Sequence, residues 1–135
     1  MDYYMNDQNC VDRLFNEWKQ HGKIIIAYDM DDTVFDFHNK GLHYNDVITL
    51  LKDVKKIGSY FICFTGRTDI DNVKQYLLDK DIPFDKINEN MEFADFTGRK
   101  VYANIYLDDR AGLSSAYDIL KRTSVLMLDY ISKQD

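Results

Sequence analysis

The sequence predicts an α/β fold built on one doubly wound parallel sheet of about five strands. Short apolar runs rich in β-branched residues alternate along the chain with segments whose apolar residues recur at helical spacing. Alternation of this kind forms βαβ units, and right-handed crossovers place their strands in one parallel sheet with helices on both faces. A chain of 135 residues is the size of one domain, so we expect a single unit over residues 1–135.

The first half of the chain predicts two helix and strand pairs. An amphipathic helix is expected over residues 9–21, because apolar residues recur there at i, i+3, i+4 and i+7 and Gly22 follows as a stop signal. Residues 23–28, KIIIAY, predict a buried parallel strand. A second helix is expected over residues 47–57, and the run YFICF predicts a second strand over residues 60–64.

The second half predicts three more strands. A helix led by acidic residues ends before Pro83, and a weak strand signal surrounds Ile87. The apolar run over residues 102–107 predicts a fourth strand. Residues 111–120 have the pattern of a helix, and SVLML predicts a fifth strand over residues 124–128.

Composition excludes several classes of protein. A formal net charge of −6 opposes a general, sequence-independent attraction to nucleic acid or anionic lipid. Cys10 and Cys63 are the two cysteines, too few for a disulfide framework or a four-cysteine zinc site. The sequence shows neither a secretory signal pattern nor an apolar run long enough to span a membrane, so we expect a cytoplasmic protein.

Chemistry-bearing residues follow three of the predicted strands. Because the carboxyl ends of parallel strands lie at one edge of a sheet, these residues should meet there. Carboxylates that gather in a small volume repel one another, and a hard divalent cation such as Mg²⁺ relieves that repulsion. Mg²⁺ commonly shares its coordination shell with a phosphate, so the pattern points to phosphoryl chemistry. The three segments are Asp29-Met30-Asp31-Asp32-Thr33, Thr65-Gly66-Arg67 and Asp108-Asp109.

These segments, in this order, resemble the motifs of the haloacid dehalogenase superfamily of aspartate-nucleophile phosphohydrolases, over residues 24–128. The first motif of that family is D-x-D-x-T after an apolar strand, the second is a Thr or Ser that ends the next strand, and the fourth is a late acidic pair. A usual glycine of the first motif is replaced here by Asp32. The third motif is a lysine, for which Lys100 is favoured over Lys86 and the neighbouring Arg99.

The resemblance implies a role for each of the two acids of the first motif. Asp29 would attack phosphorus through one carboxylate oxygen and bind Mg²⁺ through the other, giving an aspartyl-phosphate. Asp31 would protonate the leaving oxygen and then take a proton from the attacking water, while its backbone carbonyl ligates the metal.

The resemblance also assigns the remaining residues. Thr65 and Lys100 would hold the non-bridging phosphoryl oxygens, and Asp108 and Asp109 would complete the Mg²⁺ site. The residues expected to bind substrate are Thr33, Gly66 and Arg67.

The spacing of the motifs bears on the substrate. The intervals between Asp29 and Thr65 and between Thr65 and Asp108 are already filled by predicted elements, so no cap domain fits. An open site admits a large substrate, or an oligomer covers a small one. The T-G-R and L-D-D-R segments are similar to the phosphatase half of phage polynucleotide kinases, and D-M-D-D-T-V-F-D-F is similar to the start of deoxyribonucleotidases. A nucleotide or a polynucleotide end is therefore the expected substrate.

Three other readings use the same acids. A receiver domain of two-component signalling places its acidic pair after the first strand, the reverse of the order seen here. A metal-dependent nuclease would use Asp29, Asp31, Asp108 and Asp109 to hold two ions about 4 Å apart. A non-catalytic binding module of the same fold is the third, and the intact pair Asp29 and Asp31 counts against it.

Overall fold

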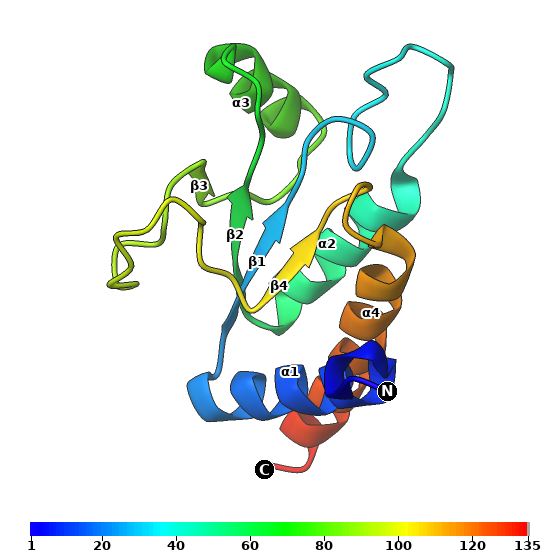
Figure 1. The fold of residues 1–135 in the computed structure, drawn as a ribbon, viewed down its shortest axis with the longest axis vertical. Coiled ribbons are helices and arrows are strands. Elements are labelled where there is room, and N and C mark those ends of the chain that lie inside the picture. The colour runs from blue at the N-terminus through cyan, green and yellow to red at the C-terminus, as the bar shows by residue number, and fades with distance from the viewer. Residues whose placement is uncertain (135) are drawn as a thin grey trace.

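The computed structural model describes residues 1–134, which form four α-helices, one short 3-10 helix and four strands (Figure 1). The elements are η1 Tyr3–Met5, α1 Asp7–His21, β1 Ile24–Tyr28, α2 Asn45–Ile57, β2 Ser59–Cys63, α3 Ile70–Asp79, β3 Lys86–Ile87, β4 Ile105–Leu107 and α4 Leu113–Ser132. The α/β class and the order of the first eight predicted elements are confirmed. Among the described residues, no helix combines the length and the apolar character needed to cross a bilayer.

The strands form one parallel sheet in the order β3-β2-β1-β4. β1 lies inside the sheet, and its last residue, Tyr28, pairs with the last residue of β2, Cys63, and the last residue of β4, Leu107. The three strands therefore end at the same level. The residues that follow them, which carry the predicted motifs, begin together at one edge of the sheet.

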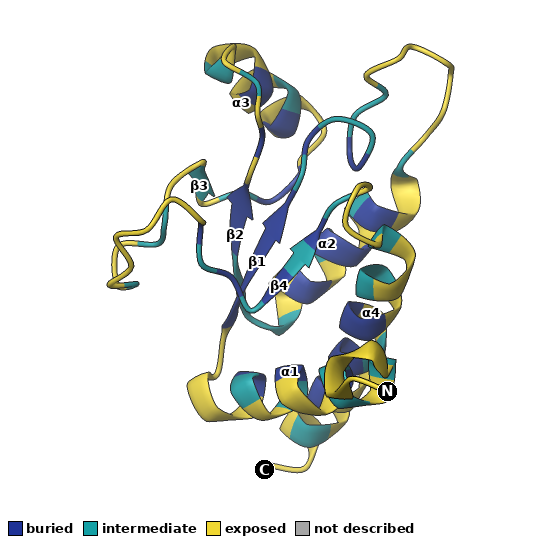
Figure 2. Cartoon of the chain, in the orientation of Figure 1, coloured by how far each residue is buried: buried dark blue, intermediate teal, exposed yellow. Residues whose placement is uncertain are grey.

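One face of the sheet is covered by all four helices. Alternate strand residues such as Ile26 and Tyr28 belong to a core cluster with side chains from α1, α2, α3 and α4. Figure 2 shows β1 as buried, β3 as intermediate, and buried residues on all four helices. A parallel strand covered on both faces has no exposed side, which explains why every residue of β1 is apolar and buried.

The opposite face is covered by a helix-free segment, residues 88–104, which crosses from β3 to β4. Ile25, Ala27 and Ile62 pack on this face against Val101 and Ala103. The prediction of helices on both faces is therefore wrong. The physical reason lies in the crossover itself: its apolar residues do not recur at helical spacing, and Gly98 interrupts it.

The predicted fifth strand is also wrong, because residues 124–128 continue α4 without a break. No glycine or proline separates them from the helix before them. The buried residues of α4 recur at helical spacing through this stretch: Ile119, Leu120, Thr123, Ser124 and Met127. A short apolar run cannot by itself distinguish a strand from a helix, and the continuation of the helical stripe decides between them here.

β4 is shorter than predicted because side-chain hydrogen bonds replace part of its ladder. Asn104, just before β4, accepts a hydrogen bond from the Ile25 amide through Oδ1 at 2.7 Å. Its Nδ2 group donates to Glu17 of α1 at 2.9 Å. The Tyr106 hydroxyl accepts from the Ala103 amide at 3.1 Å and holds the chain in a turn. The regular strand therefore begins only at residue 105.

Two side chains also bond to the outer edge of β2. Asp85 accepts a hydrogen bond from the Phe61 amide at 2.8 Å, and Asn88 accepts one from the Thr65 amide at 2.8 Å. These residues lie on either side of β3, which is only two residues long. β3 and the two residues that flank it therefore cover more of the outer edge of β2 than the two residues of β3 could cover alone.

Candidate active site

Three carboxylates converge at the carboxyl ends of β1 and β4. Asp29 follows β1 directly, and its amide donates a hydrogen bond to the Leu107 carbonyl at 2.9 Å. This bond continues the β1 and β4 pairing by one residue and aligns the two chain exits. One oxygen each of Asp29, Asp108 and Asp109 lie within 4.8 Å of one another. The structure thus brings together three of the residues that the sequence predicted to bind metal.

The environment of Asp29 opposes its ionisation. Partial burial, a hydrogen bond with the Asp109 side chain and the negative charge of Asp108 raise the pKa of Asp29 to about 7, the burial acting most strongly. A carboxyl group shifted this far carries an unfavourable charge at neutral pH. A cation among the three carboxylates would remove this cost, so the donor set fits a hard divalent ion that prefers oxygen ligands.

Asp31 does not share the position of these three side chains. Its carboxylate accepts a hydrogen bond from the Arg67 guanidinium, with Nη1 and Oδ1 3.2 Å apart. Arg67 also donates from Nε to Asp69 at 2.9 Å, which raises the pKa of Arg67 and lowers the pKa of Asp69 to about 2. Arg67 therefore lies in the site, where it holds Asp31 beside the acidic cluster.

A tight turn after β1 sets the direction of Asp31. The Met30 carbonyl accepts hydrogen bonds from the amides of Val34 and Phe35, both at 3.1 Å. The Asp32 amide donates back to the Phe35 carbonyl at 2.8 Å. Asp32 has φ of 61°, a left-handed conformation that favours glycine and that Asp tolerates better than most residues. The turn therefore accommodates Asp32 at the position where the resembled motif more often has glycine.

Thr33 does not face the open site as expected of a substrate-binding residue. Its side chain is completely buried. Its hydroxyl donates to Asp109 Oδ1 at 3.3 Å and accepts from the Asp109 amide at 3.1 Å. The prediction that Thr33 binds substrate is therefore not supported, because its hydroxyl is already paired with the side chain and the amide of Asp109. Thr33 thus fixes the position of one of the three converging carboxylates.

Thr65 and Gly66 follow β2 at the same edge. The Thr65 hydroxyl accepts a hydrogen bond from the Arg67 amide at 3.2 Å, which leaves its proton free to donate to another group. A Cβ atom added at Gly66 would meet no atom within 4 Å, so the chain there is open to an approaching ligand. Gly66 therefore has the access that substrate contact requires, whereas Thr65 is buried, with only 8% of its surface exposed.

Asn88 is a positioning residue that the sequence reasoning missed. It follows β3 with φ of 58°, and its amide donates to the Cys63 carbonyl at 2.9 Å. Its side chain accepts from the Thr65 amide and so fixes the loop that carries Thr65. The available signal was an asparagine directly after a short apolar run, since Asn is enriched in left-handed positions.

The two lysines considered for the third motif differ in their surroundings. The Lys86 ammonium forms an ion pair with Glu92 at 3.0 Å, which also raises the pKa of Lys86. The Lys100 ammonium lies 4.9 Å from the centroid of the Tyr106 ring. Lys100 also lines a cavity of about 910 Å³ with Asp108 as another wall residue. Lys100 lies in the loop before β4, and its assignment to the third motif stays a prediction.

Comparison with known proteins supports the fold and gives no information on activity. No protein-family model matches the chain, and neither does any curated protein. The solved structure described as a conserved protein coded by locus from Bacteroides thetaiotaomicron matches with a TM-score of 0.59 and 22% sequence identity. The match covers 74% of this chain and 91% of that one. The two chains share a fold.

Proposed function

We propose that this protein is a Mg²⁺-dependent phosphomonoester hydrolase that works through an aspartyl-phosphate on Asp29. The observation that carries this proposal is the convergence of Asp29, Asp108 and Asp109 within 4.8 Å at the end of the sheet. Arg67 holds a further acid, Asp31, beside them. The resemblance of the strand-end motifs to the haloacid dehalogenase superfamily assigns the same residues to this chemistry.

Asp29 acts as the nucleophile in this proposal. One of its carboxylate oxygens attacks phosphorus as the bond from phosphorus to the leaving oxygen breaks, and a water molecule later hydrolyses the acyl phosphate. Asp31 gives a proton to the leaving oxygen in the first step and takes one from the water in the second. The hydrogen bond that Asp31 Oδ1 accepts from Arg67 orients the carboxyl group.

Mg²⁺ would be held by the side chains of Asp29, Asp108 and Asp109 and by the backbone carbonyl of Asp31. When bound, the ion offsets negative charge on the phosphoryl group and on Asp29 itself. Thr33 supports this set through its two hydrogen bonds to Asp109.

The phosphoryl oxygens meet donors from two loops. The Thr65 hydroxyl has a proton to donate, because its oxygen already accepts from the Arg67 amide. Gly66 leaves room beside it. Lys100 supplies a positive charge from the loop before β4. Electrostatic stabilisation of the transferring phosphoryl group is the main contribution to catalysis of phosphoryl transfer.

Phosphate release tests the proposal directly. Wild-type protein with Mg²⁺ is incubated with an aryl phosphate, sugar phosphates, nucleoside monophosphates and 3′- or 5′-phosphorylated oligonucleotides. We expect release that is abolished by EDTA and by Asp29→Asn but retained by Asp53→Asn, an exposed acid on α2. A beryllium fluoride adduct on Asp29 would report the acyl-phosphate state.

Two outcomes contradict the proposal. Cleavage of phosphodiesters with no release of phosphate would identify a nuclease. Folded, Mg²⁺-binding protein that releases no phosphate from the whole panel would favour a non-catalytic binding module.

A further inference from the structure

A second pocket lies on the helix-free face of the sheet, near the amino ends of β1 and β2. Its volume of about 770 Å³ falls within the range of roughly 300–1,000 Å³ that small-molecule sites occupy. Three segments line it: residues 21–25 at the start of β1, Tyr60 of β2, and residues 93–104 of the crossover to β4. Within the described chain, its lining includes none of the residues that the proposed active site uses.

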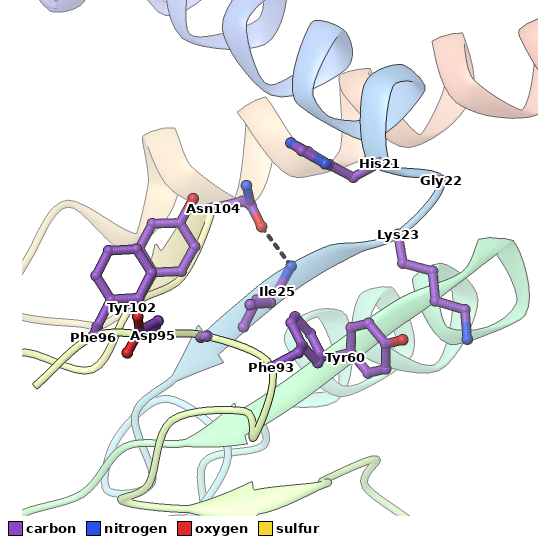
Figure 3. A pocket seen from close by; sticks show the side chains of 11 residues that line it. His21, Gly22, Lys23, Ile25, Tyr60, Phe93, Asp95, Phe96, Tyr102 and Asn104 are labelled. Atoms are coloured by element: carbon purple, nitrogen blue, oxygen red, sulfur yellow. Dashed lines mark hydrogen bonds between the residues drawn. The ribbon is translucent and has the colours of Figure 1, made fainter.

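Two pairs of aromatic rings form the walls of this pocket, which we call the aromatic pocket. Phe96 and Tyr102 are stacked, with centroids 4.3 Å apart and an angle of 10° between their planes. Tyr60 and Phe93 form the second pair, with centroids 5.0 Å apart and an angle of 53°. Figure 3 shows the two pairs on opposite sides of Ile25 in that view, with the Ile25 side chain between them. Because each ring contacts a partner ring, the walls are formed without a ligand.

The floor of the aromatic pocket belongs to the core of the sheet. Ile25 is only 5% exposed and packs in one cluster with Ala27, Ile62 and Val101. Its amide is already bonded to the Asn104 side chain at 2.7 Å. The floor therefore offers apolar surface to a ligand and does not require a polar group from it.

Two of the wall rings are open to solvent. Phe93 is 63% exposed and Phe96 is 50% exposed. A ligand that covers them removes apolar surface from water, which favours binding. A planar aromatic ligand also gains stacked or edge-to-face contacts with the ring pairs, and a saturated ligand of the same size does not.

The charges around the aromatic pocket balance one another. With histidine counted as neutral, the lining carries one positive charge, on Lys23, and one negative charge, on Asp95. The Lys23 ammonium lies 4.9 Å from the centroid of the Tyr60 ring and so already contacts a wall of the pocket. A ligand with a net charge of either sign would meet a like charge here, so an uncharged ligand is favoured.

The shape of the pocket favours a small molecule over another protein chain. Walls from three segments surround a buried floor, which makes a recess rather than a flat face. Its exposed large apolar side chains are those of Phe93 and Phe96. A stable protein interface, by contrast, buries about 800 Å² on each partner.

We propose that the aromatic pocket binds an uncharged, planar aromatic small molecule between its two ring pairs, with Ile25 beneath it. This site is separate from the proposed active site. Four residues of extended chain lead from Ile25 to Asp29, a span of roughly 13 Å at about 3.3 Å per residue. A ring in the aromatic pocket therefore does not reach Asp29, and binding there does not depend on the proposed phosphatase activity.

A set of probes with one carbon skeleton tests the class of ligand. The protein is titrated with 2-naphthol, with its saturated analogue decahydro-2-naphthol, with the anion 2-naphthoate and with the cation 2-naphthylmethylammonium at pH 7. Kd is measured from amide chemical shifts in two-dimensional NMR spectra. We expect 2-naphthol to bind at least tenfold more tightly than each of the other three, and to shift the amides of Ile25, Tyr60 and residues 93–104.

Substitutions in the walls test the location. Phe93→Ala and Phe96→Ala should each raise the Kd for 2-naphthol at least fivefold, and because both side chains are exposed, both variants should keep the fold, which their Tm verifies. Phe37→Ala is the matched control, since Phe37 is a phenylalanine that is 54% exposed in the loop after β1. This control and Asp29→Asn should both leave the Kd unchanged.

Several outcomes would overturn the aromatic pocket as a ligand site. Equal affinity for 2-naphthol and its saturated analogue would show that the ring pairs do not select a planar ligand, and tighter binding of either ion would contradict the uncharged class. Shifts centred on Asp29 and Thr65 would place the probe in the proposed active site instead. Self-association that Phe93→Ala abolishes would show that a second copy of the chain covers the rings.

Discussion

Asp29 has the carboxyl group with the clearest physical signature in this site. Its pKa is raised to about 7 by burial and by its two acidic neighbours. The unfolded chain, by contrast, releases this proton near pH 4. Between these two values the folded protein holds a proton that the unfolded chain has lost, so the free energy of unfolding falls as the pH rises from about 4 to about 7.

This difference predicts that the metal-free protein becomes less stable as the pH rises, and that a bound metal ion opposes this change. In EDTA, the protein should have a higher Tm at pH 5 than at pH 8, and Asp29→Asn should remove most of that difference. The pKa shift of Asp29 corresponds to about 4 kcal/mol at about 1.36 kcal/mol per pKa unit. Because solvent screens the charges around this half-buried group, the expected contribution to the free energy of unfolding is on the order of 1–2 kcal/mol. Calorimetry at both pH values, with Asp53→Asn as control, measures the effect. An unchanged pH slope in Asp29→Asn would contradict it.

Mg²⁺ should oppose this trend. Because metal binding requires the ionised carboxylates, Mg²⁺ should raise Tm more at pH 8 than at pH 5. The raised pKa of Asp29 and the proposed metal site thus have the same cause, which is the close approach of Asp29, Asp108 and Asp109.

Thr33 ties the segment after β4 to the turn after β1. Thr33→Val keeps the shape of the side chain, removes both hydrogen bonds to Asp109 and leaves the Asp109 amide without its acceptor. We expect a loss of about 1–3 kcal/mol in the free energy of unfolding and weaker Mg²⁺ binding. Urea unfolding and Mg²⁺ titration measure both. Thr49→Val, at an exposed position of α2, is the control, and equal losses in the two variants would show that the Thr33 hydroxyl is not special.

At the scale of elements, α4 is the helix whose second half the sequence analysis assigned to a strand. Val125 lies in that half with 62% of its surface exposed, so a substitution there tests backbone preference with little change in packing. Val125→Ala should raise the free energy of unfolding by a few tenths of a kcal/mol, since Ala is the better helix former. Val125→Gly should lower it by about 0.5 kcal/mol. Urea unfolding orders the three proteins, and a wild type more stable than Val125→Ala would favour the strand.

The differences between sequence and structure have two physical origins. The strands of the sheet interior and the amphipathic helices were predictable, because Ile24–Tyr28 and the stripes of α1 and α2 follow the period of their elements. The helix-free crossover was not, because its fold depends on apolar residues that meet the sheet without any period of their own. Residues 124–128 were assigned to a strand on local composition, while packing of Ser124 and Met127 against the core continued the helix.

The site was predictable in its location more than in its contacts. The acids after β1 and β4 follow from parallel topology, because strands that end at one level bring their next residues together. Hydrogen-bond partners depend on geometry across loops far apart in sequence. The bond from Thr33 to Asp109 and the bond from the Thr65 amide to Asn88 are of this kind, and no local pattern announces them.

At the scale of the whole molecule, Asn104 joins three elements. It bonds to Ile25 at the start of β1 and to Glu17 of α1 while it leads into β4. Asn104→Ala should lower the free energy of unfolding by about 1–3 kcal/mol, because it leaves the Ile25 amide without its acceptor. Asn72→Ala, an exposed substitution on α3, should change it by less than about 0.5 kcal/mol. Urea unfolding of both variants makes the comparison, and equal losses would contradict the tie.

The pairing of the outer edge of β2 affects whether the protein can associate with itself. An unpaired strand is a template on which another chain can add a strand of its own, and this is a common route to aggregation. Here the template is closed on one side by β3 and by the Asp85 and Asn88 side chains, which occupy the Phe61 and Thr65 amides. On the other side, β4 offers only three residues. The sheet therefore presents no long free edge, and concentrated protein should resist edge-to-edge polymerisation even where its apolar interior strands would favour it.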